Sequence, residues 1–105
     1  MAKATESVKQ DKKEVVVFAK PYQYEGKEYV EVDLSGVNNL TGDDLLNTEQ
    51  KFNELGSISP MPQVTLPYTL LIAAEVTDLP FEFFKGLPAK EALKIRTMVM
   101  VFLNN

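Results

Sequence analysis

The chain has 105 residues, of which 45% are hydrophobic and 25% charged, and it contains no cysteine and no histidine. This length is typical of one domain with a single core, and the lack of cysteine excludes a disulfide framework and thiolate metal sites. The net charge of −4 and the single arginine, Arg96, argue against nucleic-acid binding, which depends on neutralising phosphates with basic side chains.

Residues 1–13 are polar and charged, and they predict a disordered tail, because such a segment buries too little apolar surface to offset the entropy of ordering it. A tail that folds onto a partner is the alternative. The segment does not resemble a signal peptide, and no run reaches the roughly 18 apolar residues of a membrane span. We therefore expect a cytoplasmic protein without a membrane partner, formed by one domain over residues 14–105.

Residues 14–34 predict a β-hairpin. A β-branched and aromatic run at residues 15–18 favours a strand, and Gly26 allows the positive φ of a tight turn. Pro21 has no N–H to give to a ladder, so we expect it at an edge or a bulge.

The register of this hairpin stays open on sequence alone. A two- or four-residue loop places Lys20 opposite Glu31 and Tyr22 opposite Tyr29, and a three-residue loop fits almost as well. In the second strand, alternation places Val30, Val32 and Leu34 on one face and Tyr29, Glu31 and Asp33 on the other.

Three main helices are expected after the hairpin, at about residues 42–55, 67–77 and 88–103. Thr41 is a capping residue for the first, whose apolar stripe contains Leu45, Phe52 and Leu55, and Gly56 ends it. Pro67 and Pro88 suit the first position of the second and third helices. The second helix is apolar nearly all round, which predicts a central position.

The third helix carries its apolar stripe at Ala92, Ile95, Val99 and Phe102. The side chains of Lys90, Glu91 and Lys94 are expected in solvent. The fold class predicted by all these elements is α+β, with an N-terminal hairpin packed beside a small helical bundle.

Catalytic chemistry finds little support in the sequence. No histidine is available as a base for the four serines, and Asp43 and Asp44 are explained by the first turn of a helix rather than by a cation. We therefore expect no enzyme and no catalytic, cofactor-binding or metal site.

Surplus apolar side chains in the last third of the chain indicate protein binding instead. Three phenylalanines share one turn and point in different directions, and a methionine-rich stretch near the end lacks a polar face. An exposed apolar patch usually marks a partner site, although each of these residues could equally complete the core. The candidate partner-binding residues are Phe81, Phe83, Phe84, Met98, Met100 and Val101.

The order of these parts resembles the tail assembly chaperones of long-tailed bacteriophages and prophages. The likeness covers residues 18–103 and rests on five segments. The first three are a hairpin with Glu-Gly-Lys at residues 25–27, a connector with the sequence Asp-Leu-Ser-Gly at 33–36, and a helix start with the sequence Leu-Thr-Gly-Asp at 40–43. The last two are the helix segment 66–74 and the segment Leu-Pro-Phe-Glu-Phe-Phe-Lys-Gly-Leu-Pro at 79–88, before the last helix. The motifs are fairly specific in their order and spacing rather than one by one.

This resemblance implies a non-catalytic protein that binds the tape measure protein and keeps it soluble during tail assembly. It also implies self-association, because many copies coat one client, and it makes the tail tube protein a further candidate partner. Two other interpretations remain open at this point: a structural virion or head–tail connection protein, and a small regulatory protein that binds a host enzyme.

Overall fold

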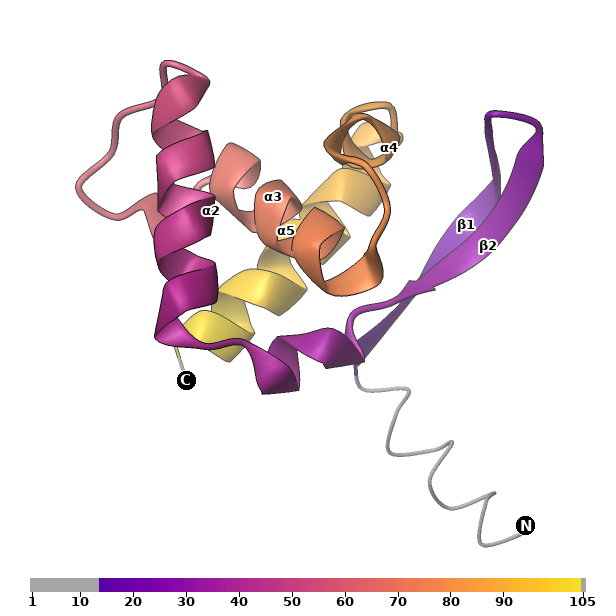
Figure 1. The fold of residues 1–105 in the computed structure, drawn as a ribbon. Coiled ribbons are helices and arrows are strands. Elements are labelled where there is room, and N and C mark those ends of the chain that lie inside the picture. The colour runs from indigo at the N-terminus through magenta and orange to yellow at the C-terminus, as the bar shows by residue number, and fades with distance from the viewer. Residues whose placement is uncertain (1–13, 105) are drawn as a thin grey trace, which may run out of the picture.

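A β-hairpin beside a bundle of helices forms the computed structural model, which describes residues 14–104 (Figure 1). The elements follow in the order β1 (Val15–Tyr24), β2 (Lys27–Asp33), the 3-10 helix η2 (Ser35–Asn39), α2 (Gly42–Glu54), the 3-10 helix η3 (Pro62–Val64), α3 (Leu66–Thr77), α4 (Phe81–Lys85) and α5 (Ala89–Leu103). The predicted α+β class is confirmed. The disordered tail predicted for residues 1–13 lies outside the described residues.

The hairpin turn consists of Glu25 and Gly26, which both have positive φ, of 48° and 81°. Two consecutive positive φ values are those of a tight two-residue hairpin turn whose twist matches the flanking strands. Of the registers that the sequence left open, the structure has that of the two-residue loop, in which Tyr22 pairs with Tyr29. The pairing of Lys20 with Glu31 is wrong, because Val17 takes that place.

A bulge in β1 explains the difference. The register shifts between Val17 and Tyr22, so several residues of β1 stand opposite the single residue Val30 of β2. Pro21 lies inside this shift, which confirms the expectation that it sits where no ladder N–H is needed.

Burial along β2 does not follow the predicted alternation. Val32 and Leu34 are buried, but Val30, two residues before Val32, is 53% exposed. The ring of Tyr29 instead packs edge-on against Phe83, with the ring centroids 4.8 Å apart. The predicted grouping of Val30 with Val32 and Leu34 therefore does not match their burial, and Tyr29 of the other group packs against the core.

Helix α2 begins with the predicted cap. The hydroxyl of Thr41 accepts a bond from the backbone N–H of Asp44, and the Asp44 carboxylate accepts one from the N–H of Thr41, so both groups are satisfied reciprocally. Phe52 is buried on the inner face, but Leu55 is half exposed, which corrects its place on the buried stripe. Gly56, with φ at 82°, follows the helix end as expected.

Helix α3 lies at the centre of the bundle and contacts α2, α4 and α5, as Figure 1 shows. It starts at Leu66 with Thr65 as its cap, so Pro67 occupies the second helical position rather than the first. Its six residues from Tyr68 to Ala73 are all buried, which confirms the central position predicted from its apolar circumference.

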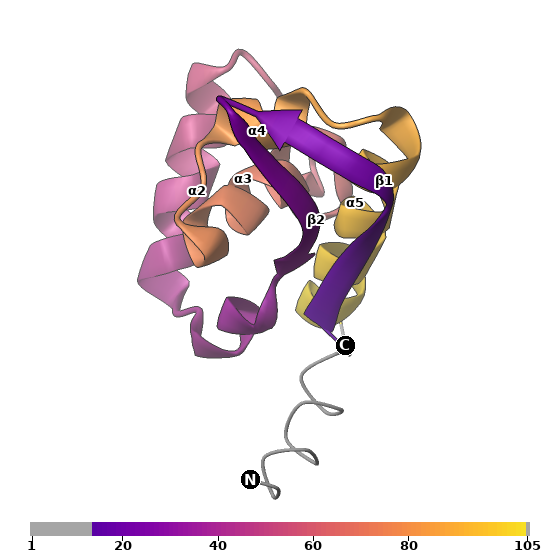
Figure 2. The same cartoon turned by 90° about the vertical axis from the view of Figure 1, so that its right-hand side faces the viewer.

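Helix α5 packs its predicted stripe inward, and Ile95 and Val99 are completely buried. Pro88 is its N-cap, so the helix starts at Ala89, one residue after the predicted start. Strand β1 runs alongside α5, so the hairpin covers a side of the bundle that α2 leaves open (Figure 2).

Candidate functional site

Two of the six predicted partner-binding residues lie in the core. Phe83 and Phe84 have no exposed surface, so the expectation that they contribute to an exposed patch is wrong. Phe83 is surrounded by the rings of Tyr22, Tyr24 and Tyr29, at centroid distances of 4.8 to 5.2 Å. The hairpin thus covers Phe83 with three aromatic rings, and the ring of Phe84 packs edge-on against that of Phe83.

Phe81 is partly exposed and lies apart from the methionine-rich end of α5. It borders a shallow depression with Leu71, Leu79 and Pro80. The ammonium of Lys85 stands 5.5 Å from the centre of its ring, a distance that allows a cation–π contact. Phe81 therefore does not join Met98 and Val101 in one surface.

The structure does bring Met98 and Val101 together, in a groove between β1 and α5. Val101 is 52% exposed, and Met98 is partly buried against the core. Met100 is also half buried but does not line the groove. Two of the six predicted partner-binding residues, Met98 and Val101, therefore lie on a common concave surface.

The groove has a volume of about 1100 Å³ and is open along its length. Its floor and walls come from one strand, one helix and a contact from η2. The lining residues are Glu14, Val15, Val16, Val17, Val37, Lys90, Leu93, Lys94, Thr97, Met98, Val101 and Phe102.

Both walls of the groove are fixed to the core. Val16 faces inward from β1, and Ile95 and Val99 face inward from α5, each with at most 4% of its surface exposed. The neighbouring residues Val17, Leu93 and Val101 therefore point outward, with exposed fractions of 43 to 59%. A partner would meet a surface that is already formed, which lowers the entropy lost on binding.

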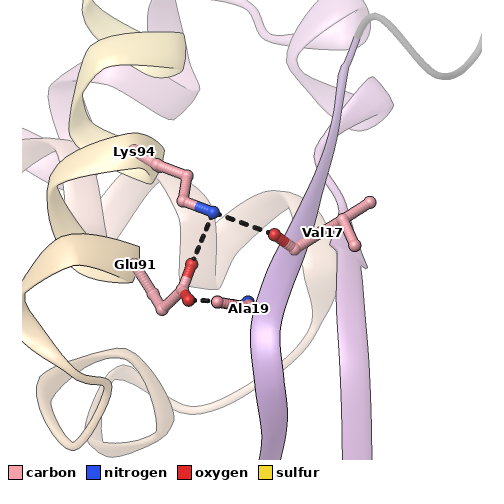
Figure 3. A network of polar contacts seen from close by, with 4 residues as sticks. All are labelled: Val17, Ala19, Glu91 and Lys94. Carbon is pink, nitrogen blue, oxygen red and sulfur yellow. Dashed lines mark hydrogen bonds and ion pairs between the residues drawn. The ribbon is translucent and has the colours of Figure 1, made fainter.

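A polar network closes one end of the groove, and Figure 3 shows its four residues. A carboxylate oxygen of Glu91 accepts a 2.8 Å hydrogen bond from the backbone N–H of Ala19, and its other oxygen lies 2.9 Å from the ammonium of Lys94. The same ammonium donates to the carbonyl of Val17 at 3.0 Å. Helix α5 thereby binds the backbone of β1 at the bulge.

The prediction that the side chain of Glu91 lies in solvent is wrong, because Glu91 is buried. Only 5% of the residue is exposed. The hydrogen bond from Ala19 and the nearby Lys94 hold the pKa of Glu91 below its ordinary value, against the opposing effect of burial. Periodicity alone could not reveal this role, because the partner is a backbone N–H that becomes free only through the bulge.

Sequence reasoning also missed exposed apolar side chains on the other side of the molecule. Leu46 in α2 is 64% exposed, and Ile58 in the following loop is 94% exposed. Leu46 follows Leu45 but lies off the apolar stripe of α2, and Ile58 stands between two serines, so neither residue belongs to a periodic apolar pattern.

The groove is lined mostly by apolar side chains, and its polar side chains are those of Glu14, Lys90, Lys94 and Thr97. Within residues 14–104, no group of three acidic side chains is placed to hold a metal ion. The helices in this part of the chain are all too short or too polar to cross a membrane. The site is thus a preformed apolar groove on an α+β domain.

No protein-family model, curated protein or solved structure matches the chain significantly. The likeness to tail assembly chaperones therefore remains a prediction from the sequence motifs.

Proposed function

We propose that this protein is a tail assembly chaperone of a bacteriophage or prophage, which binds the tape measure protein without catalysis and keeps it soluble. The observation that carries the proposal is the open apolar groove between β1 and α5, which contains Met98 and Val101 of the predicted site. The chaperone acts in the cytoplasm of the bacterial host, where tails assemble.

The groove suits a client of this kind because its walls are aliphatic and adaptable. Val17, Leu93 and Val101 present branched side chains that a partner can cover, and Met98 adds a flexible thioether that adjusts to different partners. A long client offers many apolar segments, and a surface without strict polar requirements can hold several of them.

The charge of the chain supports the same role. The net charge of −4 keeps a protein with an uncovered apolar groove from self-precipitating. Several copies bind one client in this proposal, so self-association on the client is part of it, and the tail tube protein is the partner that displaces them.

Co-expression with a tape measure protein tests the proposal. The wild-type chain is expected to keep the client in the soluble fraction, and Val101→Asp to lose this activity, because a carboxylate in the groove would be desolvated by the client. Leu46→Asp is the matched control, since it adds the same charge to an exposed leucine outside the groove.

Both variants must keep the wild-type circular dichroism spectrum and melting temperature. Equal solubilisation by the wild type and Val101→Asp would contradict the proposed site. Stoichiometric amounts of the protein in purified tails would instead favour a structural virion component.

A further inference from the structure

The pairing of β1 with β2 determines which backbone groups of β1 face the groove. The N–H of Leu34 donates to the carbonyl of Glu14 at 2.7 Å, so Glu14 and Leu34 form a hydrogen-bonded pair. Such pairs alternate along an antiparallel ladder, so Val16 pairs with Val32 in the same way. The backbone groups of the residues between them, Val15 and Val17, point away from β2.

Two contacts confirm this direction. The carbonyl of Val17 accepts a bond from Lys94, and the N–H of Ala19 donates to Glu91, and both partners belong to α5 on the outer side of β1 (Figure 3). The outer edge of β1 therefore faces α5 across the groove.

Three further backbone groups on this edge point away from β2 and, unlike the carbonyl of Val17 and the N–H of Ala19, make no hydrogen bond to α5 within residues 14–104. They are the N–H and the carbonyl of Val15 and the N–H of Val17. Both residues line the groove. An edge with free donors and acceptors is a template for a further strand, and extended peptides commonly bind proteins by adding to such an edge.

The opposite wall suits the side chains of an added strand. Leu93, Thr97 and Val101 recur along α5 at intervals of four, so they form one row facing the groove. Side chains of an extended segment alternate in direction, so every second one would pack against this row while the others face solvent.

Charge distinguishes the two ends of the groove. Lys94 is already paired with Glu91, whereas Lys90, one turn earlier in α5, takes part in neither of the two ion pairs found in residues 14–104. An acidic side chain at this end of the bound segment would face an ammonium without a competing carboxylate.

We propose that the groove binds its partner as an extended strand that adds to β1 at Val15 and Val17. The bound segment has an aliphatic side chain at every second position and an acidic residue at the Lys90 end. This inference rests on the proposed function, because it takes the groove as the client site. It adds that the client segment binds in an extended rather than a helical conformation.

Selection from a random dodecapeptide library displayed on phage tests the proposal. The full-length protein serves as the target, and the Val101→Asp variant removes peptides that bind elsewhere. We expect the selected peptides to share aliphatic residues with a spacing of two and an aspartate or glutamate near one end.

Binding of the best selected peptide to the isotope-labelled protein is then followed by NMR. We expect slower hydrogen exchange at the amides of Val15 and Val17. N-methylation of the one peptide amide that donates to Val15 should weaken binding about tenfold, since it removes a hydrogen bond and keeps every side chain. Lys90→Ala should weaken binding of the same peptide severalfold.

Apolar residues at spacings of three and four in the selected peptides would overturn strand addition and leave the proposed groove function standing. Equal binding of the N-methylated peptide would likewise overturn it. If no peptide depends on Val101, strand addition fails, and the co-expression experiment then decides the proposed function by itself.

Discussion

The hydroxyl of Tyr22 in β1 donates a 2.9 Å hydrogen bond to the carbonyl of Phe83 in α4. The same oxygen lies only 2.5 Å from the place that a Cβ atom would occupy at Gly86. The absence of a side chain at Gly86 therefore lets the hairpin approach the end of α4 closely enough to cover Phe83.

Gly86→Ala should destabilise the fold by about 1–3 kcal/mol, because the new methyl group displaces the Tyr22 hydroxyl. Tyr22→Phe removes that hydroxyl and should cost about 0.5–1.5 kcal/mol for the lost hydrogen bond. In the double variant the methyl group has space, so the combined cost should be less than the sum of the two. Denaturant unfolding of the wild type, the two single variants and the double variant measures this coupling. Losses of unfolding free energy that are fully additive would show that the close approach of the Tyr22 hydroxyl to Gly86 does not limit the packing.

Phe83→Ala should cost about 3–5 kcal/mol, as expected for a large aromatic side chain removed from a core. Phe81→Ala should cost less than about 2 kcal/mol, because its ring stays partly in contact with water. Thermal unfolding of the two variants compares neighbours of the same residue type in one short helix. Similar losses at both positions would contradict the burial of Phe83 by the hairpin.

Glu91 should make stability depend on pH. Its pKa is lower in the folded protein than its ordinary value, so the folded state favours the carboxylate. The resulting stabilisation is complete above the ordinary pKa of glutamate, about 4.3, and is lost as the pH falls through the lower folded value. Glu91→Gln should therefore reduce the fall in unfolding free energy between about pH 5 and pH 3.

Glu31→Gln is the control for this experiment, since Glu31 is exposed. The fall in unfolding free energy at low pH should be smaller in Glu91→Gln than in this control. If the unfolding free energy of Glu91→Gln depends on pH as that of the wild type does, the charge of the Glu91 carboxylate does not hold β1 to α5.

Gly36 and Gly42 provide a matched pair. A Cβ atom at Gly36 would lie 2.9 Å from the carbonyl oxygen of Val76, whereas at Gly42 nothing lies within 4 Å. Gly36→Ala should destabilise by about 1–3 kcal/mol, since backbone must shift. Gly42→Ala should stabilise by up to about 1 kcal/mol, since it restricts the unfolded chain in the first turn of α2. Melting temperatures that move the same way would contradict the close approach of η2 to α3.

The helices could be predicted because their signals are local. The cap at Thr41, the proline near the start of α3 and the glycine after α2 each act on groups a few residues away. The same is true of the hairpin turn at Glu25 and Gly26. These features required no knowledge of how the elements pack.

The site depended on tertiary packing, and the sequence predicted only part of it. Met98 and Val101 were recognised because the polar face of α5 disappears near its end. The burial of Phe83 and Phe84 could not be foreseen, because it depends on tertiary packing, which for Phe83 includes three tyrosine rings of the hairpin. The buried Glu91 likewise depends on a bulge in β1, whose position follows from the pairing of two strands.

Site-specific photo-crosslinking tests whether the groove between β1 and α5 holds the client. A photoreactive phenylalanine analogue replaces Val101 in the groove or, as the control, Ile58, which is 94% exposed in the loop after α2. With the tape measure protein co-expressed, irradiation should give a covalent complex from position 101 and little or none from position 58. Equal yields from the two positions, or a complex from position 58 alone, would show that the groove is not the client site.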